Sequence, residues 1–252
     1  MNTLVVGDTT PILSLLKNQK RFLLIDDGEM IDSLTFPKHW DVEYFDVREH
    51  HFNPLKGMTY LKAREFVSIL DAVFPEGENT LTKKTTRFVL LSALLEHPTR
   101  LSHLFHRKTE ENADAYQKIH TLLLSPVLKS VLSKPINFSP DGVLLVRLNR
   151  AELGDFDCFV LGNLLISLYQ GQVVIPDFGF YGAAHHTALI RQHRLIAGVR
   201  YLDETTLTND LLLMDRVGSK CLFKDAEVLA DFQGLTKGTN EYNEAVQRLM
   251  GV

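Results

Sequence analysis

Acidic residues follow three apolar runs in the sequence, at points where a buried β-strand would end. These acids are Asp8 after the run 3–6, Asp26 after the run 21–25, and Asp177 after the run 173–176. Ligands of an open parallel sheet bind at the carboxyl ends of its strands, so binding chemistry is expected at these points. The carboxylate oxygens of Asp26 and Asp177 could hold Mg²⁺. A helix that begins there could receive a phosphate group at its amino end.

The residues Gly7, Asp8, Thr9 and Thr10 are the candidate phosphate-binding loop, because a helical pattern follows them and Thr10 is a suitable N-cap. A Walker A loop has the pattern GxxxxGK(S/T), in which the Lys reaches the phosphates and the hydroxyl holds Mg²⁺. Here the charge of Asp8 opposes phosphate, and no Lys occurs before Lys17. Tight ATP binding is therefore not expected at this degenerate loop. A plain strand-to-helix turn is the alternative.

The segment Val173–Asp177 has the form of a Walker B strand, with apolar residues that end in an acid. Asp177 could hold Mg²⁺ through a water molecule. The next residue is Phe178, where an ATPase of this kind places the Glu that orients the attacking water, so the base for hydrolysis is missing. A buried Phe178 would support loss of catalysis, whereas a Phe178 exposed in a cleft would indicate a replaced ligand. Asp26 is a second candidate for a divalent cation, with capping of the following turn as its alternative.

The histidines and cysteines do not have the spacing of a metal site. The histidines occur as the pair at 50 and 51 and as a group at 185, 186 and 193, without an HExxH motif or accompanying carboxylates. A polar surface is therefore expected there rather than zinc. Cys158 and Cys221 lie in no CxxC motif, and both are expected to be buried small hydrophobes.

The elements that position these residues alternate between strand and helix at both ends of the chain. Strands are predicted at 3–6, 21–26, 42–46, 142–148, 173–177 and 195–199, with a final apolar run at 221–223. Helices are predicted at 12–17, at 152–170 as one long amphipathic helix, and at 184–192. Helical spacing fills residues 60–133. The pattern predicts one α/β domain over 1–252, with a mainly parallel sheet covered by helices and a helical insertion at 60–133.

Length and composition exclude several classes of protein. The chain has 252 residues, of which 45% are hydrophobic, and its net charge of −4 argues against a broad surface that coats nucleic acid. No apolar run approaches the ~18 residues that a membrane span needs. The first residues have neither a basic leader nor a long apolar core, so a cytoplasmic location is expected.

Several local strings occur in an order that resembles the HerA/FtsK superfamily of DNA-pumping ATPases, in particular the branch that serves conjugative type IV secretion and packaging motors. The strings are Leu23–Glu29, Tyr44–Asp46, Phe52–Leu55, Thr80–Thr82, Val143–Leu148 with Leu153–Gly154, the strand that ends at Asp177, Leu189–His193 and Ala197–Leu202. The likeness extends from about residue 3 to residue 232. It implies a P-loop NTPase-like fold of the RecA and FtsK/HerA type, with ATP and Mg²⁺ as cofactors.

Departures from the family pattern affect the catalytic positions. The Walker A Lys is absent, Phe178 replaces the catalytic Glu, and Arg200 stands in place of the sensor Gln. The resemblance therefore implies a catalytically degenerate subunit, structural or regulatory, of an assembly for DNA translocation, transfer or packaging, encoded by a phage or mobile element. It also implies that Arg191 or Arg194 could reach a neighbouring subunit's nucleotide as an arginine finger.

Alternatives remain open from the sequence. Arg191 and Arg194 could instead pair with surface acids such as Asp203 and Glu204. The chain could be a divergent but active ATPase that uses the loop 7–10 with Asp26 or Asp177 on Mg²⁺. It could also be an interaction module unrelated to DNA, with residues 60–133 as its docking surface. The expected partners are other proteins, further copies of this chain in a ring, or DNA.

Overall fold

The computed structural model describes residues 2–6, 10–74, 80–181, 186–192, 194–199, 220–223 and 239–241. Its centre is a sheet with the strand order β3-β4-β2-β5-β6-β1-β7, and every pairing described between neighbours is parallel. The strands are β1 Thr3–Val6, β2 Phe22–Asp26, β3 Val42–Phe45, β4 Val143–Arg147, β5 Gln172–Ile175, β6 Leu195–Val199 and β7 Lys220–Phe223. The predicted mainly parallel sheet is confirmed.

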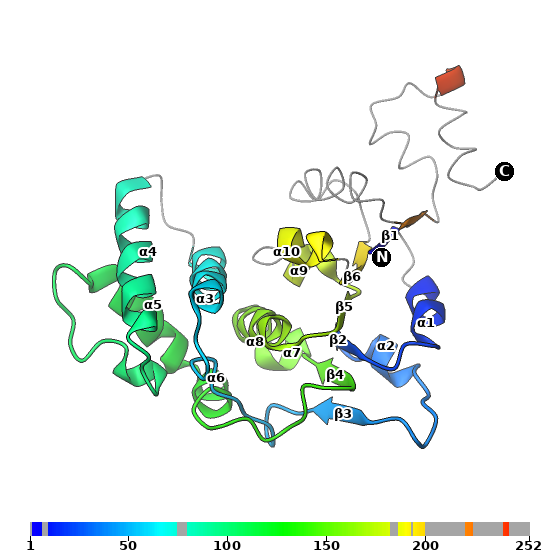
Figure 1. Ribbon diagram of the computed structural model, residues 1–252, viewed down its shortest axis with the longest axis horizontal. Helices are drawn as coiled ribbons and strands as arrows, with labels where there is room; N and C mark the ends of the chain where they lie inside the picture. The colour runs from blue at the N-terminus through cyan, green and yellow to red at the C-terminus, as the bar shows by residue number, and fades with distance from the viewer. Residues whose placement is uncertain are drawn as a thin grey trace.

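The central strands are apolar on both faces because helices cover both faces of the sheet. On one face, Phe22 and Leu24 of β2 pack in the same cluster as residues of α1 (Thr10–Leu16) and α2 (Glu29–Asp32). On the other face, Leu23 and Ile25 join a larger cluster that contains the remaining helices. The three layers can be followed in Figure 1, with α1 and α2 on one side and α8 to α10 on the other.

Four helices follow β4 and β5 on the second face: α7 (Arg150–Leu153), α8 (Asp155–Leu168), α9 (Phe178–Tyr181) and α10 (His186–Arg191). The prediction of one amphipathic helix over 152–170 is wrong in two respects. Gly154 has a φ of 82°, a left-handed conformation that separates α7 from α8. Most side chains of α8 are buried, because it lies between the sheet and the outer helices, so it has no polar stripe.

An outer group of helices lies between β3 and β4 in sequence. It contains α3 (Tyr60–Val73), α4 (Thr80–Leu95), a 3₁₀-helix (Leu101–His103), α5 (Ala113–Leu124) and α6 (Pro126–Val131). These helices cover the outer side of α8, and α3 packs directly against it (Figure 1). The buried carboxylate of Asp71 on α3 pairs with Arg87 of α4 and with Lys118 of α5, at 3.1 Å for the Lys118 pair. This ion triad links three helices of the group.

Across the described ranges, no helix has both the length and the apolar composition that crossing a bilayer would require.

Candidate functional site

A cleft of about 270 Å³ opens at the carboxyl ends of β2, β4 and β5. The chain leaves β2 through α2 on one face of the sheet and leaves β5 through α9 on the other face. Such a divergence of connections opens a crevice at the strand ends, which is where open α/β sheets bind ligands. The lining includes three residues singled out by sequence: Thr10, Asp26 and Asp177. The structure thus brings these three residues to one cleft.

Asp26 is buried and acts as the cap of α2. Its Oδ2 accepts hydrogen bonds from the backbone N–H groups of Gly28 at 3.0 Å, Met30 at 2.8 Å and Ile31 at 3.3 Å. Gly28 has a φ of 133°, which lets the chain turn tightly around the carboxylate. One oxygen of Asp26 is thus committed to the backbone, as the capping alternative predicted.

Asp177 lies beyond the end of β5, at the entrance to α9, and its carboxylate is half-exposed. Its Oδ2 is 3.3 Å from the guanidinium of Arg150, the first residue of α7. The Arg150 guanidinium also lies over the ring of Phe180, 4.4 Å from its centroid. Arg150 was missed by the sequence reasoning, although it follows β4 by three residues and so occupies a fourth strand end. Applying the same rule to β4 would have found it.

Phe178 is only 1% exposed and packs in the core cluster on the α8 face of the sheet. It is not part of the described cleft lining. The residue after the Walker B-like acid therefore contributes to packing, and it presents no group to the cleft.

The charge of the cleft is strongly negative. Four acids line it, namely Asp26, Asp27, Glu29 and Asp177, and Arg150 is the only basic residue of the described lining. Because Arg150 already pairs with Asp177, little positive charge is left to attract a phosphate. A cation would fit this balance better. The described residues contain no group of three or more His, Cys, Asp or Glu side chains placed to hold a metal ion, so Mg²⁺ at Asp26 and Asp177 stays a prediction.

Only the last residue of the candidate phosphate loop can be placed. Gly7, Asp8 and Thr9 lie outside the described residues, as does Arg200 at the sensor position. Thr10, the expected N-cap, is the first residue of α1, which begins two residues before the helix predicted at 12–17, and it lines the cleft. Such a shift is within the usual variation of helix boundaries.

Arg194 lies at the amino ends of β5 and β6, the edge of the sheet opposite the cleft. Its Nε donates to the carbonyl of Gly171 at 2.9 Å, and its two terminal nitrogens donate to the carbonyl of Tyr169 at 2.8 Å and to Gln192 Oε1 at 2.9 Å. Burial lowers the pKa of this guanidinium. These contacts give Arg194 a structural role within the chain.

Arg191 ends α10 and is exposed, so the trans-acting finger stays a prediction for this residue. Its proposed surface partners Asp203 and Glu204 lie outside the described residues.

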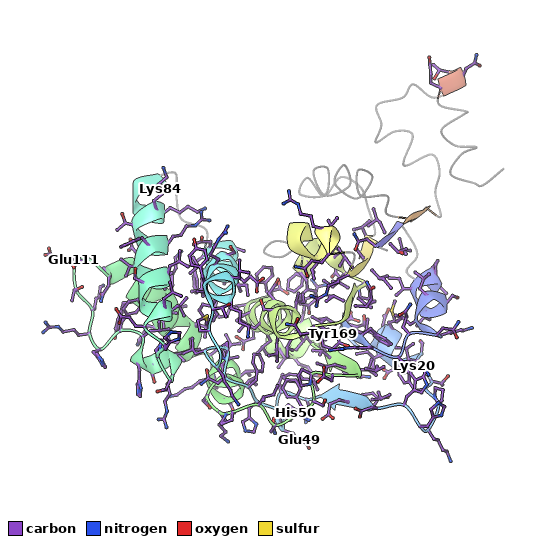
Figure 2. All side chains as sticks on the ribbon, in the orientation of Figure 1. Lys20, Glu49, His50, Lys84, Glu111 and Tyr169 are labelled. Carbon is purple, nitrogen blue, oxygen red and sulfur yellow. The ribbon has the colours of Figure 1, made fainter. Side chains whose placement is uncertain are left out.

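The remaining His and Cys candidates that the structure describes contact neighbouring residues of the fold. His50 lies beside β3 (Figure 2), where its Nδ1 accepts from the backbone N–H of Asp46 at 2.9 Å and its Nε2 is 3.3 Å from Glu43. The predicted burial of Cys158 is confirmed, and burial raises the pKa of its thiol to about 12, which makes it unreactive. His185 and His193 lie outside the described residues.

No protein-family model matches the sequence, and no curated protein matches it closely. Solved structures do resemble the fold. The plasmid coupling protein TrwB in complex with the non-hydrolysable ATP analogue ADPNP matches with a TM-score of 0.52 at 14% identity, over 85% of this chain and 68% of that chain.

Two further structures of TrwB give the same result. The trigonal form of the bacterial conjugative coupling protein TrwBΔN70 in complex with sulphate has a TM-score of 0.53 at 14% identity, over 88% of this chain and 69% of that one. The unbound monoclinic form has a TM-score of 0.55 at 14% identity, over 92% and 71%. The likeness shows the predicted P-loop NTPase-like α/β fold.

Proposed function

We propose that this protein is a catalytically degenerate ATPase-fold subunit of a DNA-transfer assembly, in which it acts as a structural or regulatory component. Two independent arguments support the connection with DNA transfer: the order of sequence strings that resembles the HerA/FtsK superfamily, and a fold similar to that of a conjugative coupling protein. The expected partners are other subunits of that assembly, further copies of this chain, or DNA.

The observation that carries the loss of hydrolysis is the burial of Phe178. A motor of this fold needs a carboxylate beside the Walker B acid to orient the attacking water. Here the side chain after Asp177 is 1% exposed and packed in the core, so no base can be supplied from that position. The acidic lining of the cleft adds to this argument, because its four carboxylates repel a nucleotide's phosphates and the one basic residue of the described lining, Arg150, is already paired with Asp177.

The test measures nucleotide binding and turnover in the same sample. Thermal melts are recorded with millimolar ATP and MgCl₂ and, as the control, with MgCl₂ alone, because the acidic cleft could respond to the cation by itself. A ligand at 100 times its dissociation constant stabilises a protein by ~2.7 kcal/mol, which is a midpoint shift of roughly 5 to 10 °C for a chain of this size. Phosphate release is followed in parallel.

We expect equal midpoints with and without ATP, and no phosphate release above background. A clear ATP-dependent shift with phosphate release would contradict the proposal and favour the divergent active ATPase. A shift without release would keep the loss of hydrolysis and assign the protein a nucleotide-gated regulatory role.

A further inference from the structure

A second groove, larger than the cleft, lies in the outer helices between the 3₁₀-helix, α5 and α6. Its volume is about 580 Å³. We call it the α5–α6 groove. It is separated from the sheet by α3 and α8 (Figure 1), so it does not belong to the site at the strand ends. The described linings of the groove and the cleft share no residue, so the groove is a separate candidate site.

The floor of the α5–α6 groove is made of leucines. Leu101 and Leu132 are buried at its base, and Leu123 is half-buried. Leu124, at the end of α5, is 65% exposed. Leu124 thus extends the apolar surface of the floor to the solvent-exposed edge of the groove.

The rim of the groove is positively charged. Arg100 and Lys129 line it and are exposed, and neither forms an ion pair with any residue that the structure describes. The described lining contains no acidic residue. The surrounding sequence has the same bias, because residues 80–134 contain nine Lys and Arg against four Asp and Glu in a chain of net charge −4.

We propose that the α5–α6 groove docks an acidic amphipathic helix of a partner protein. The leucine floor would receive the apolar face of that helix, and Arg100 and Lys129 would pair with carboxylates along its flank. A nucleic acid strand fits less well. Sites for single strands combine a cationic track with aromatic side chains on which bases stack, and the described lining contains no Phe, Tyr or Trp.

The test uses a fluorescein-labelled helical peptide with Leu on one face and Glu on the other, and measures its binding by anisotropy. The control peptide has Lys in place of every Glu, and an oligothymidylate serves as a third probe. Lys129→Glu reverses one charge of the rim. Lys108→Glu is the matched control, because Lys108 is an exposed lysine outside the groove lining.

We expect the native protein to bind the Glu peptide at least about tenfold more tightly than the Lys peptide. Lys129→Glu should weaken binding of the Glu peptide by roughly tenfold and strengthen binding of the Lys peptide. Lys108→Glu should change both affinities by less than about twofold. Leu124→Ser should also weaken the Glu peptide by several-fold, because it removes apolar surface from the contact. Thermal melts identify any variant that fails to fold, and Arg100→Glu then replaces Lys129→Glu.

Equal affinity for the two peptides would overturn the proposal. So would equal effects of Lys129→Glu and Lys108→Glu. Oligothymidylate binding that depends on Lys129 and excludes the Glu peptide would assign the groove to nucleic acid instead.

Discussion

Asp26 and Asp177 are both carboxylates of the cleft, but their surroundings give them different roles. Asp26 is buried and holds three backbone N–H groups at the start of α2, whereas Asp177 is half-exposed and makes one ion pair at 3.3 Å with Arg150. Hydrogen bonds from amides to a buried carboxylate are worth more than an exposed ion pair, since solvent screens the latter. The fold therefore depends on Asp26, and Asp177 is the acid left available to a ligand.

Replacing each acid by Ala separates these roles. We expect Asp26→Ala to lower the free energy of unfolding by about 2 kcal/mol, because α2 loses its cap and the amides lose their acceptor. Asp177→Ala should cost less than ~1 kcal/mol, the usual value of an exposed ion pair. Urea denaturation at neutral pH measures both. Similar losses of unfolding free energy in the two variants would show that the fold depends on Asp26 no more than on Asp177.

The candidate site was predictable where a strand end is followed directly by an acid. Asp26 and Asp177 were found in this way, because the carboxyl ends of parallel strands meet at one edge. Arg150 was not found, because the strand-end rule was applied to β1, β2 and β5 and not to β4, whose last residue it follows by three positions. That Arg194 binds carbonyls at the opposite edge could not be predicted either, because its partners Gly171 and Tyr169 follow another helix.

At the scale of elements, a close contact between α8 and α9 positions one residue of the cleft lining. A Cβ added at Gly162 of α8 would lie 2.5 Å from Cε1 and 2.7 Å from Cδ1 of the Tyr181 ring. Tyr181 is the last residue of α9 and lines the cleft. The absence of a side chain at Gly162 thus lets α9 approach α8 and brings Tyr181 to the edge of the site.

Gly162→Ala should lower the free energy of unfolding by about 1 to 3 kcal/mol through this overpacking, although Ala in place of Gly stabilises an open helix by about 1 kcal/mol. A double-mutant cycle with Tyr181→Ala, followed by urea denaturation, checks the cause. In the Tyr181→Ala background the clash is gone, so Gly162→Ala should become neutral or stabilising. If Gly162→Ala lowers the free energy of unfolding equally in both backgrounds, the contact with Tyr181 is not the cause of the loss.

The prediction of a helix from its apolar periodicity failed for α8, which is buried on more than one side. An apolar pattern with a period of 3.6 residues indicates a helix with one solvent-exposed face. In contrast, α8 is covered by the sheet on one side and by the outer helices on the other. The predicted long amphipathic helix therefore combined α7 and α8 across Gly154. The four-residue α9 was missed because one turn gives no period. The buried strands were predicted within one or two residues, since continuous apolar runs indicate strands covered on both faces.

At the scale of the whole molecule, the strand order could not be read from the sequence. Thr3 of β1 pairs with Ile196 of β6 and Lys220 of β7, which are 193 and 217 residues later in the chain, so the order depends on pairing between distant segments. The distribution of charge, in contrast, was already present in the sequence. Acids collect at the cleft, and the excess of Lys and Arg lies in residues 80–134, which contain α4, the 3₁₀-helix, α5 and α6.

Two exposed side chains of α4 are of the types that contact single-stranded nucleic acid. Phe88 is 70% exposed, and the exposed Lys84 lies one helical turn before it. Figure 2 shows Lys84 on α4 at one side of the molecule and Lys20 at the other side, near the sheet. An exposed aromatic ring can stack on bases, and a neighbouring lysine can contact phosphate. If the protein contacts DNA within a transfer assembly, this face is where we expect the contact.

Charge reversal at the two labelled lysines tests this expectation. We expect Lys84→Glu to weaken binding of a fluorescent oligothymidylate several-fold and to reduce the slope of log affinity against log salt by about one, because one phosphate contact is lost. Phe88→Ala should weaken binding by ~1 to 3 kcal/mol with an unchanged slope, since stacking involves no counterion release. Lys20→Glu changes the net charge equally and should leave both quantities unaltered. If Lys20→Glu and Lys84→Glu weaken binding to the same extent, net charge explains the attraction and α4 is not the DNA-binding face.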